Sequence, residues 1–123
     1  MQVQHDGDLE IVTGELVTVT VTAIKTHYLA IFGDLLHAEW TIVAPVQPAG
    51  PDRVREVRSF VAQAPGTEAF AISCDFVRNT DNQPKPGALY EILLKGDGPL
   101  VIRKLILPLP PFPAVRPFVF EVR

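Results

Sequence analysis

The sequence predicts an all-β fold, an antiparallel β-sandwich of eight or nine strands that forms one domain over residues 1–123. Val, Ile and Thr supply 31 residues, whereas Lys supplies 4, and β-branched residues fit pleated sheets better than helices. The 12 prolines and 8 glycines divide the chain into short apolar segments. These segments recur about every 8 to 14 residues, as in sandwiches and small barrels. No helix long enough to connect parallel strands is expected.

The clearest strand is expected at residues 16–24, where Val17, Val19 and Val21 alternate with threonines. A period of two places the valines on one face and the threonines on the other. A strand is expected at residues 67–77 for the same reason, with four residues directed inward: Phe70, Ile72, Cys74 and Phe76.

The remaining elements follow from the spacing of apolar segments and turn residues. The other expected strands are residues 9–13, 28–32, 37–43, 54–62, 88–95, 100–107 and 118–122. The expected connections are a loop at 45–51, a polar loop at 78–87, a tight hairpin at 95–98 and a proline-rich crossing at 108–117.

Residues 27–40 also allow a second interpretation, a helix of one or two turns. Leu29, Phe32, Leu36 and Trp40 fall at helical spacing. Gly33 lies in the middle and costs a helix about 1 kcal/mol relative to Ala, so the strand, turn and strand interpretation is preferred.

Charge and chain chemistry exclude several classes of function. The net charge is −3, and the 7 arginines and 4 lysines are scattered, whereas a nucleic-acid binder normally carries a basic stripe. No basic segment followed by an apolar one opens the chain, and no run approaches the roughly 18 apolar residues that cross a bilayer. A cytoplasmic protein that binds neither nucleic acid nor membrane is therefore expected.

No constellation typical of catalysis stands out in the sequence. The single cysteine, Cys74, lies in an alternating apolar segment and is expected to be a buried structural thiol. Ser59 and Ser73 lie in no nucleophile motif, and the glycines do not form a phosphate loop. No catalytic residue, metal ligand set or cofactor is expected.

Residues 86–92, Pro-Gly-Ala-Leu-Tyr-Glu-Ile, resemble the corner before the sixth strand of fibronectin type III and other immunoglobulin-like domains. Tyr90 would form the tyrosine corner, and Trp40, 50 residues upstream, looks like the core tryptophan of that family. The resemblance covers residues 34–107. It implies an immunoglobulin-like sandwich used for adhesion, scaffolding or ligand presentation, and it carries over no catalytic residues. The chain departs from the family by two strands before this region and one after it.

Polar and aromatic side chains suggest a ligand site formed by Tyr28, His37, Glu39, Asn79 and Asp81. Asn and Asp offer oxygens to calcium or a sugar, although they also form turns with their own backbone. His27 and His37 could instead contribute to a metal or acid–base site.

The proline-rich segment suggests a partner-binding site at Pro110, Pro111, Phe112 and Pro113. Overlapping Pro-x-x-Pro patterns favour polyproline II, which aromatic grooves recognise. The competing interpretation is a rigid crossing between the two sheets.

The surplus of large apolar residues is the strongest functional indication. Val, Ile, Leu and Phe supply 42 residues. Strands that are apolar on both faces are either covered by other parts of the same chain or bind a partner. We therefore expect a non-enzymatic module for protein–protein interaction or homo-oligomeric assembly. The alternatives are a carbohydrate or small-ligand binding domain and a small metal-dependent enzyme that uses His27 and His37.

Overall fold

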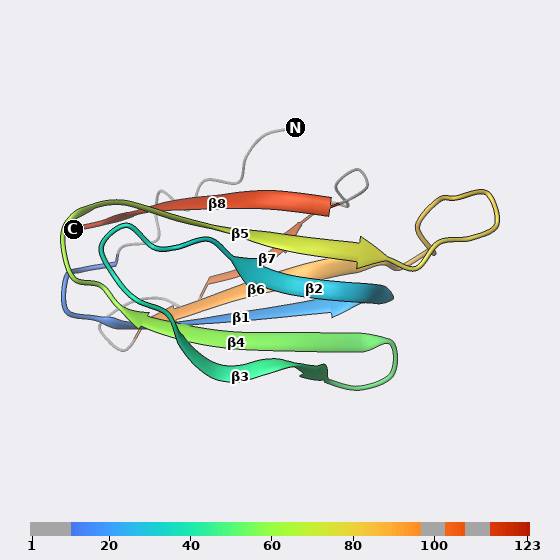
Figure 1. The fold of residues 1–123 in the computed structure, drawn as a ribbon, viewed down its shortest axis with the longest axis horizontal. Helices are drawn as coiled ribbons and strands as arrows, with labels where there is room; N and C mark the ends of the chain where they lie inside the picture. The colour runs from blue at the N-terminus through green and yellow to red at the C-terminus, as the bar shows by residue number, and fades with distance from the viewer. Residues whose placement is uncertain (1–10, 97–102, 108–113) are drawn as a thin grey trace.

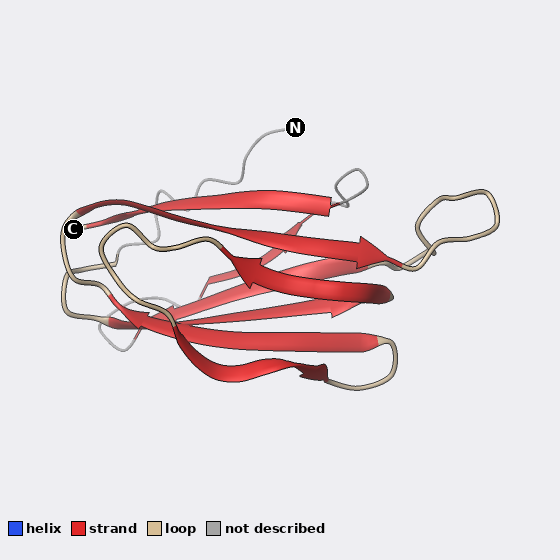
Figure 2. Cartoon of the chain, viewed as in Figure 1, coloured by secondary structure: helices blue, strands red, loops and turns tan. Residues whose placement is uncertain are grey.

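The computed structural model describes residues 11–96, 103–107 and 114–123. In these ranges the chain forms two antiparallel sheets and no helix, so the predicted all-β, sandwich-like architecture is confirmed (Figures 1 and 2). One sheet has the strand order β3-β4-β1-β6-β7 and the other has the order β2-β5-β8. The strands are β1 Leu16–Ile24, β2 Thr26–Phe32, β3 Thr41–Pro48, β4 Arg53–Val61, β5 Gly66–Phe76, β6 Leu89–Gly96, β7 Arg103–Leu107 and β8 Ala114–Val122.

Strand β1 is the centre of the larger sheet and has the bounds that the alternation predicted. It pairs with β4 on one side and with β6 on the other. Val17, Val19 and Val21 are buried between the sheets, because alternate residues of a strand point to the same face. The threonines between them point to the outer face.

The core lies between the two sheets and is rich in aromatic rings. The inward residues predicted for β5, namely Phe70, Ile72, Cys74 and Phe76, are all buried. The ring of Phe70 stacks on that of Phe118, with centroids 5.1 Å apart. The packing joins β5 to its neighbour β8, and Phe60 of β4 approaches Phe120 of β8 across the core.

An ion pair between the buried Glu56 and the half-buried Arg58 lies at the open side of the sandwich beside β2. No described strand pairs with the outer edge of β2. The Glu56 carboxylate of β4 points inward, and its Oε1 accepts the backbone N–H of Ile31 at 2.8 Å. Its Oε2 accepts a hydrogen bond from Nε of Arg58 at 2.9 Å. Inward-pointing charges of this kind protect an edge strand from pairing with another chain.

The structure corrects the expectations for residues 37–51. Residues 37–40 form a loop and not the first half of a strand, and β3 occupies much of the expected 45–51 loop. Proline is compatible with β3 because this strand lies at a sheet edge. Its pairing with β4 shifts between Ile42 and Ala44 and again between Ala44 and Gln47. The alternative helix at 27–40 is also wrong, since those residues contain none.

The ends of the chain differ from the expectation in smaller ways. The last strand begins at Ala114 and not at residue 118, so Pro117 lies inside the edge strand β8. Ile11 forms an isolated parallel bridge with Val122, while residues 9 and 10 of the expected first strand lie outside the described residues. The second half of the expected 95–98 hairpin also lies outside them.

The structure describes parts of the two residues that carried the family resemblance, Tyr90 and Trp40. Tyr90 pairs through its backbone with Ala23 and Leu107, and the conformation of its side chain is outside the described part of the chain. Trp40 lies in the loop before β3 and not in a strand, and it is half-buried against the core. The described residues include no helix that could cross a membrane.

The buried thiol leads to a prediction about reactivity. Burial raises the pKa of Cys74 from 9.0 to about 12, so at pH 8 the folded protein holds roughly a thousandfold less thiolate than an exposed cysteine would. We expect a disulfide reagent to label the native protein at least about a hundredfold more slowly than the chain unfolded in guanidinium. Rapid, complete labelling of the native protein would contradict the buried placement of this residue.

Candidate functional site

The residues predicted to form a ligand site do not come together. His37 and Glu39 lie in the loop of residues 33–40, whereas Asn79 and Asp81 lie in the loop between β5 and β6. Figure 1 shows these two loops at opposite ends of the sandwich. Tyr28 lies on β2 between them. The five residues therefore belong to three separate surfaces.

The loop of residues 33–40 is held by a buried carboxylate. Glu68 of β5 is 1% exposed, and its Oε1 accepts the backbone N–H of Leu36 at 2.6 Å. Its Oε2 accepts the backbone N–H of His37 at 2.9 Å. Hydrogen bonds to a charged acceptor are stronger than neutral ones, so Glu68 fixes the loop to the sandwich.

Trp40 anchors the other end of this loop. Its Nε1–H donates to the carbonyl oxygen of Gly33 at 2.9 Å, and its ring meets the rings of Phe60 and Phe70 edge to face, each with a centroid separation of 5.5 Å. The Arg58 guanidinium lies 5.6 Å from the Trp40 ring centroid, within the range of a cation–π contact.

The loop borders an open hollow of about 950 Å³. The hollow is lined by Asp34, Leu35, Leu36, His37, Ala38, Glu39, Trp40, Thr41, Val61 and Gln63. The His37 and Glu39 side chains are exposed here. The carboxyl groups of Asp34 and Glu39, the imidazole of His37 and the indole of Trp40 line it, so the hollow offers hydrogen bonds and one aromatic surface to a small polar ligand.

The structure does not bring His27 and His37 together. His27 lies near the start of β2 and His37 lies five residues beyond its end. The strand alone separates their backbones by roughly 15 to 20 Å. The described residues contain no group of three or more His, Cys, Asp or Glu side chains that could hold a metal ion.

Asn79 and Asp81 shape their own loop. Oδ1 of Asp81 accepts the backbone N–H of Gln83 at 3.1 Å, and the N–H of Asn79 donates to the carbonyl of Gln83 at 2.8 Å. Asn82 has a φ of 65°, the left-handed conformation that Asn tolerates in turns. These contacts support a turn at this site.

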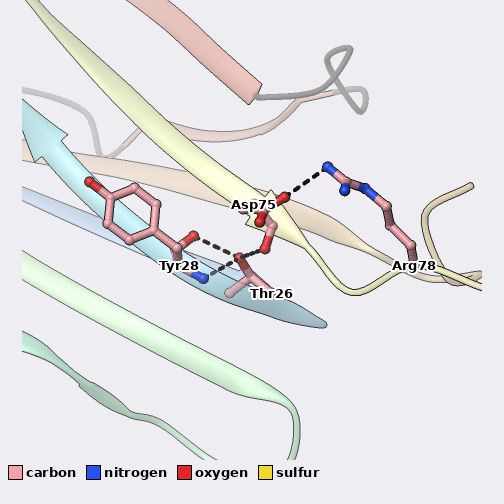
Figure 3. A network of polar contacts seen from close by, with 4 residues as sticks. All are labelled: Thr26, Tyr28, Asp75 and Arg78. Carbon is pink, nitrogen blue, oxygen red and sulfur yellow. Dashed lines mark hydrogen bonds and ion pairs between the residues drawn. The ribbon is translucent and has the colours of Figure 1, made fainter. Parts of the chain in front are cut away.

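Tyr28 is positioned by a polar network at the start of β2, drawn in Figure 3. The Thr26 hydroxyl lies 2.7 Å from the carbonyl oxygen of Tyr28 and 2.9 Å from that of Asp75. The N–H of Tyr28 donates to the same hydroxyl at 3.2 Å, and Asp75 forms an ion pair with Arg78 at 3.0 Å. The network bridges a register shift in the pairing of β2 with β5 and leaves the Tyr28 ring on the outer face.

The outer face of the β2–β5–β8 sheet is an apolar surface that the sequence did not reveal. Four large side chains are exposed on it: Tyr28 at 52%, Phe32 at 42%, Val115 at 51% and Val119 at 40%. The register aligns Phe32 with Ala71 and Pro117, and Ala30 with Ser73 and Val115. We call this surface the outer sheet face; it comprises Tyr28, Ala30, Phe32, Ala69, Ala71, Ser73, Val115, Pro117 and Val119.

The outer sheet face has a defined relief. The middle strand β5 presents only the small residues Ala69, Ala71 and Ser73, between the aromatic rings of β2 and the larger aliphatic residues of β8. The alternation of β5 predicted that its small residues point outward. The neighbours of those residues depend on strand order and register, which the sequence alone does not provide.

Pro110, Pro111, Phe112 and Pro113 lie outside the described residues, so the predicted proline-rich site stays a prediction. No family model, curated protein or solved structure matches this chain.

The role of Glu68 can be tested by substitution. In Glu68→Gln, one of the two oxygens becomes an amide donor that faces a backbone N–H, so we expect a loss of about 1 to 3 kcal/mol in the free energy of unfolding. Hydrogen exchange at the Leu36 and His37 amides should accelerate more than at β1 amides. The exposed residue Glu39 supplies the control Glu39→Gln. Unchanged protection of both amides in Glu68→Gln would show that the carboxylate does not hold the loop.

Proposed function

We propose that this protein is a non-enzymatic interaction module that docks a protein partner on the outer sheet face. The observation that carries the proposal is the exposure of Tyr28, Phe32, Val115 and Val119 on one face of the smaller sheet. Asp75, which is paired with Arg78, lies beside Tyr28 at one end of this surface, while the rows of Ala30 and Phe32 contain only small or apolar residues. Interface centres are typically depleted in charge and enriched in aromatic residues, and contiguous apolar patches are uncommon on surfaces that stay in water.

The outer face of the larger sheet provides an internal comparison. Thr18, Thr20 and Thr22 of β1 point to that face, and Arg55 donates from Nε to the Thr22 hydroxyl at 3.0 Å. Glu91 lies across from Thr22 on β6. This face is mixed, because Leu16 and Val61 are also exposed on it and Val57 and Leu93 flank Thr20. The middle strand of the outer sheet face lacks such a row of threonines and presents Ala69, Ala71 and Ser73, which supports a role in apolar contact.

The rigid support of Tyr28 adds to the proposal. The Thr26 hydroxyl accepts the N–H of Tyr28 and lies within hydrogen-bond distance of the carbonyls of Tyr28 and Asp75, so the backbone that carries the ring is held within a strand and not in a loop. Preorganised aromatic residues lose little conformational entropy on binding.

We also propose that the fold is an immunoglobulin-like variant, which agrees with an interaction role. The two antiparallel sheets and the contacts of Trp40 with Phe60 and Phe70 support this assignment. The loop position of Trp40 and the place of β1 between β4 and β6 are departures from the expected pattern.

A second candidate function is the binding of a small polar ligand such as a sugar. The hollow beside residues 33–40 favours it, because Trp40, His37 and Glu39 line one concave surface. None of the residues that line the hollow belongs to the outer sheet face, so the two functions can be tested separately.

Photo-crosslinking in cells tests the proposed docking surface. A photoreactive phenylalanine analogue replaces Phe32 on the outer sheet face, and the same analogue replaces Thr20 on the opposite face as the control. We expect a discrete adduct from position 32, identified by mass spectrometry and removed by Val119→Lys, which desolvates a charge at any interface there. Equal adducts from both positions, or none from position 32, would refute the docking surface.

A further inference from the structure

We propose that the hollow beside residues 33–40 binds a ligand that carries an ammonium group on an apolar stem. The inference rests on the second candidate function and names the chemistry of its ligand. Small-molecule sites are concave and combine apolar surface with a few polar groups that orient the ligand. The hollow has a volume of about 950 Å³, and its lining contains both kinds of surface.

The charge of the lining favours a cation. Asp34 and Glu39 contribute carboxylates, and neither forms an ion pair with a described lysine or arginine. None of the described residues that line the hollow is itself a lysine or an arginine. The buried carboxylate of Glu68, which accepts the N–H groups of Leu36 and His37, adds a further negative group beside the loop. These groups attract an ammonium and oppose an anion.

The apolar part of the lining provides the contact for the stem. Leu36 is 68% exposed and Val61 is 41% exposed, and both line the hollow together with the indole of Trp40. Arg58 lies within cation–π distance of that indole, but its charge is already paired with Glu56 at 2.9 Å. A ligand ammonium therefore finds unpaired carboxylates in the hollow, while its stem covers the two aliphatic side chains.

The same lining is less suited to a sugar or to a metal ion. A sugar can stack on the indole, but it gains nothing from the unpaired charges and sets hydroxyl groups against Leu36 and Val61. A metal ion such as calcium needs several oxygen ligands, and the described part of the chain has no group of three or more side chains that could hold one. An amphipathic organic cation uses every part of the lining.

The open shape of the hollow sets the expected affinity. The side chains of Asp34 and Glu39 are exposed, and an ion pair made by an exposed carboxylate strengthens binding only about two- to fivefold. The loop itself is already held by Glu68, so binding does not have to order it. We therefore expect a dissociation constant on the order of 1 mM for a small probe.

Three probes with one stem and different heads test the inference: phenethylammonium, phenethyl alcohol and the hydrocinnamate anion. Trp40 is the only tryptophan of the chain and lines the hollow, so its fluorescence reports occupancy. Shifts of the Leu36 and His37 amide resonances locate the probe. We expect phenethylammonium to bind at least about threefold more tightly than the alcohol and hydrocinnamate to bind most weakly. Sodium chloride should reduce the difference between the heads, because salt screens exposed charges.

Matched substitutions assign the charge effect to the hollow. Asp34→Asn and Glu39→Gln should each weaken the binding of phenethylammonium about two- to fivefold and leave that of the alcohol unchanged. Asp52→Asn is the control, since it removes the same charge before the first residue of β4, whereas Val61 at the last residue of β4 lines the hollow. All three side chains are exposed, so the variants should keep the fold, which their amide spectra verify.

Two further probes complete the test. Tighter binding of acetyl-lysine methylamide than of phenethylammonium assigns the hollow to a basic peptide side chain, and weaker binding assigns it to a small free amine. Methyl glucoside that binds where phenethylammonium does not overturns the inference and retains the second candidate function. The failure of both overturns both, while photo-crosslinking alone decides the docking surface. Equal binding of ammonium and alcohol, or unchanged binding in Asp34→Asn and Glu39→Gln, also overturns the inference.

Discussion

The arrangement of this fold depends on buried carboxylates that take the place of missing strands. The smaller sheet ends at β2, and no described strand satisfies the outward N–H of Ile31. Glu56 accepts that N–H from the opposite sheet, and Glu68 accepts two more from Leu36 and His37. A buried N–H without a hydrogen-bond partner destabilises the fold. Because these two side chains accept the N–H groups, the three-stranded sheet can end at β2 and still pack against the five-stranded sheet.

The same carboxylates account for the position of Trp40. Glu68 holds the loop after β2, and Arg58 links Glu56 to the Trp40 ring. The indole therefore closes the side of the core that an additional strand would otherwise cover. Its edge-to-face contacts with Phe60 and Phe70 join the two sheets, which couples the loop and its hollow to the packing of the core.

Much of the fold was predictable because period-two alternation is a local signal. Strand β1 and the inward face of β5 follow from Val17 to Val21 and from Phe70 to Phe76 without any knowledge of their neighbours. Residues 37–51 were not predictable in the same way, since the loop depends on Glu68, a residue about 30 positions away. Proline in β3 is tolerated only because the strand lies at an edge, and edge position is a property of the whole sheet.

The candidate site was predictable to a smaller extent for a related reason. Tyr28 was identified as a ligand-binding aromatic residue, but its neighbours on the outer sheet face come from β5 and β8 through register. A shift of one residue in β8 would turn Val115 and Val119 inward and change the surface completely. The sequence therefore indicated a surplus of apolar residues correctly while leaving their common surface undetermined.

An exposed apolar sheet is a hazard unless its edges are protected, and this fold protects them. Glu56 occupies an outward amide of β2, and β8 contains Pro117, which has no N–H to offer an added strand. Pairing of β2 or β8, the two edge strands of the smaller sheet, with a strand of another chain is thereby disfavoured. Such pairing could otherwise continue from one chain to the next. Face-to-face contact remains open, so a partner can cover the outer sheet face without extending the ladder of either edge strand. The protected edges and the exposed face are thus consistent with limited association.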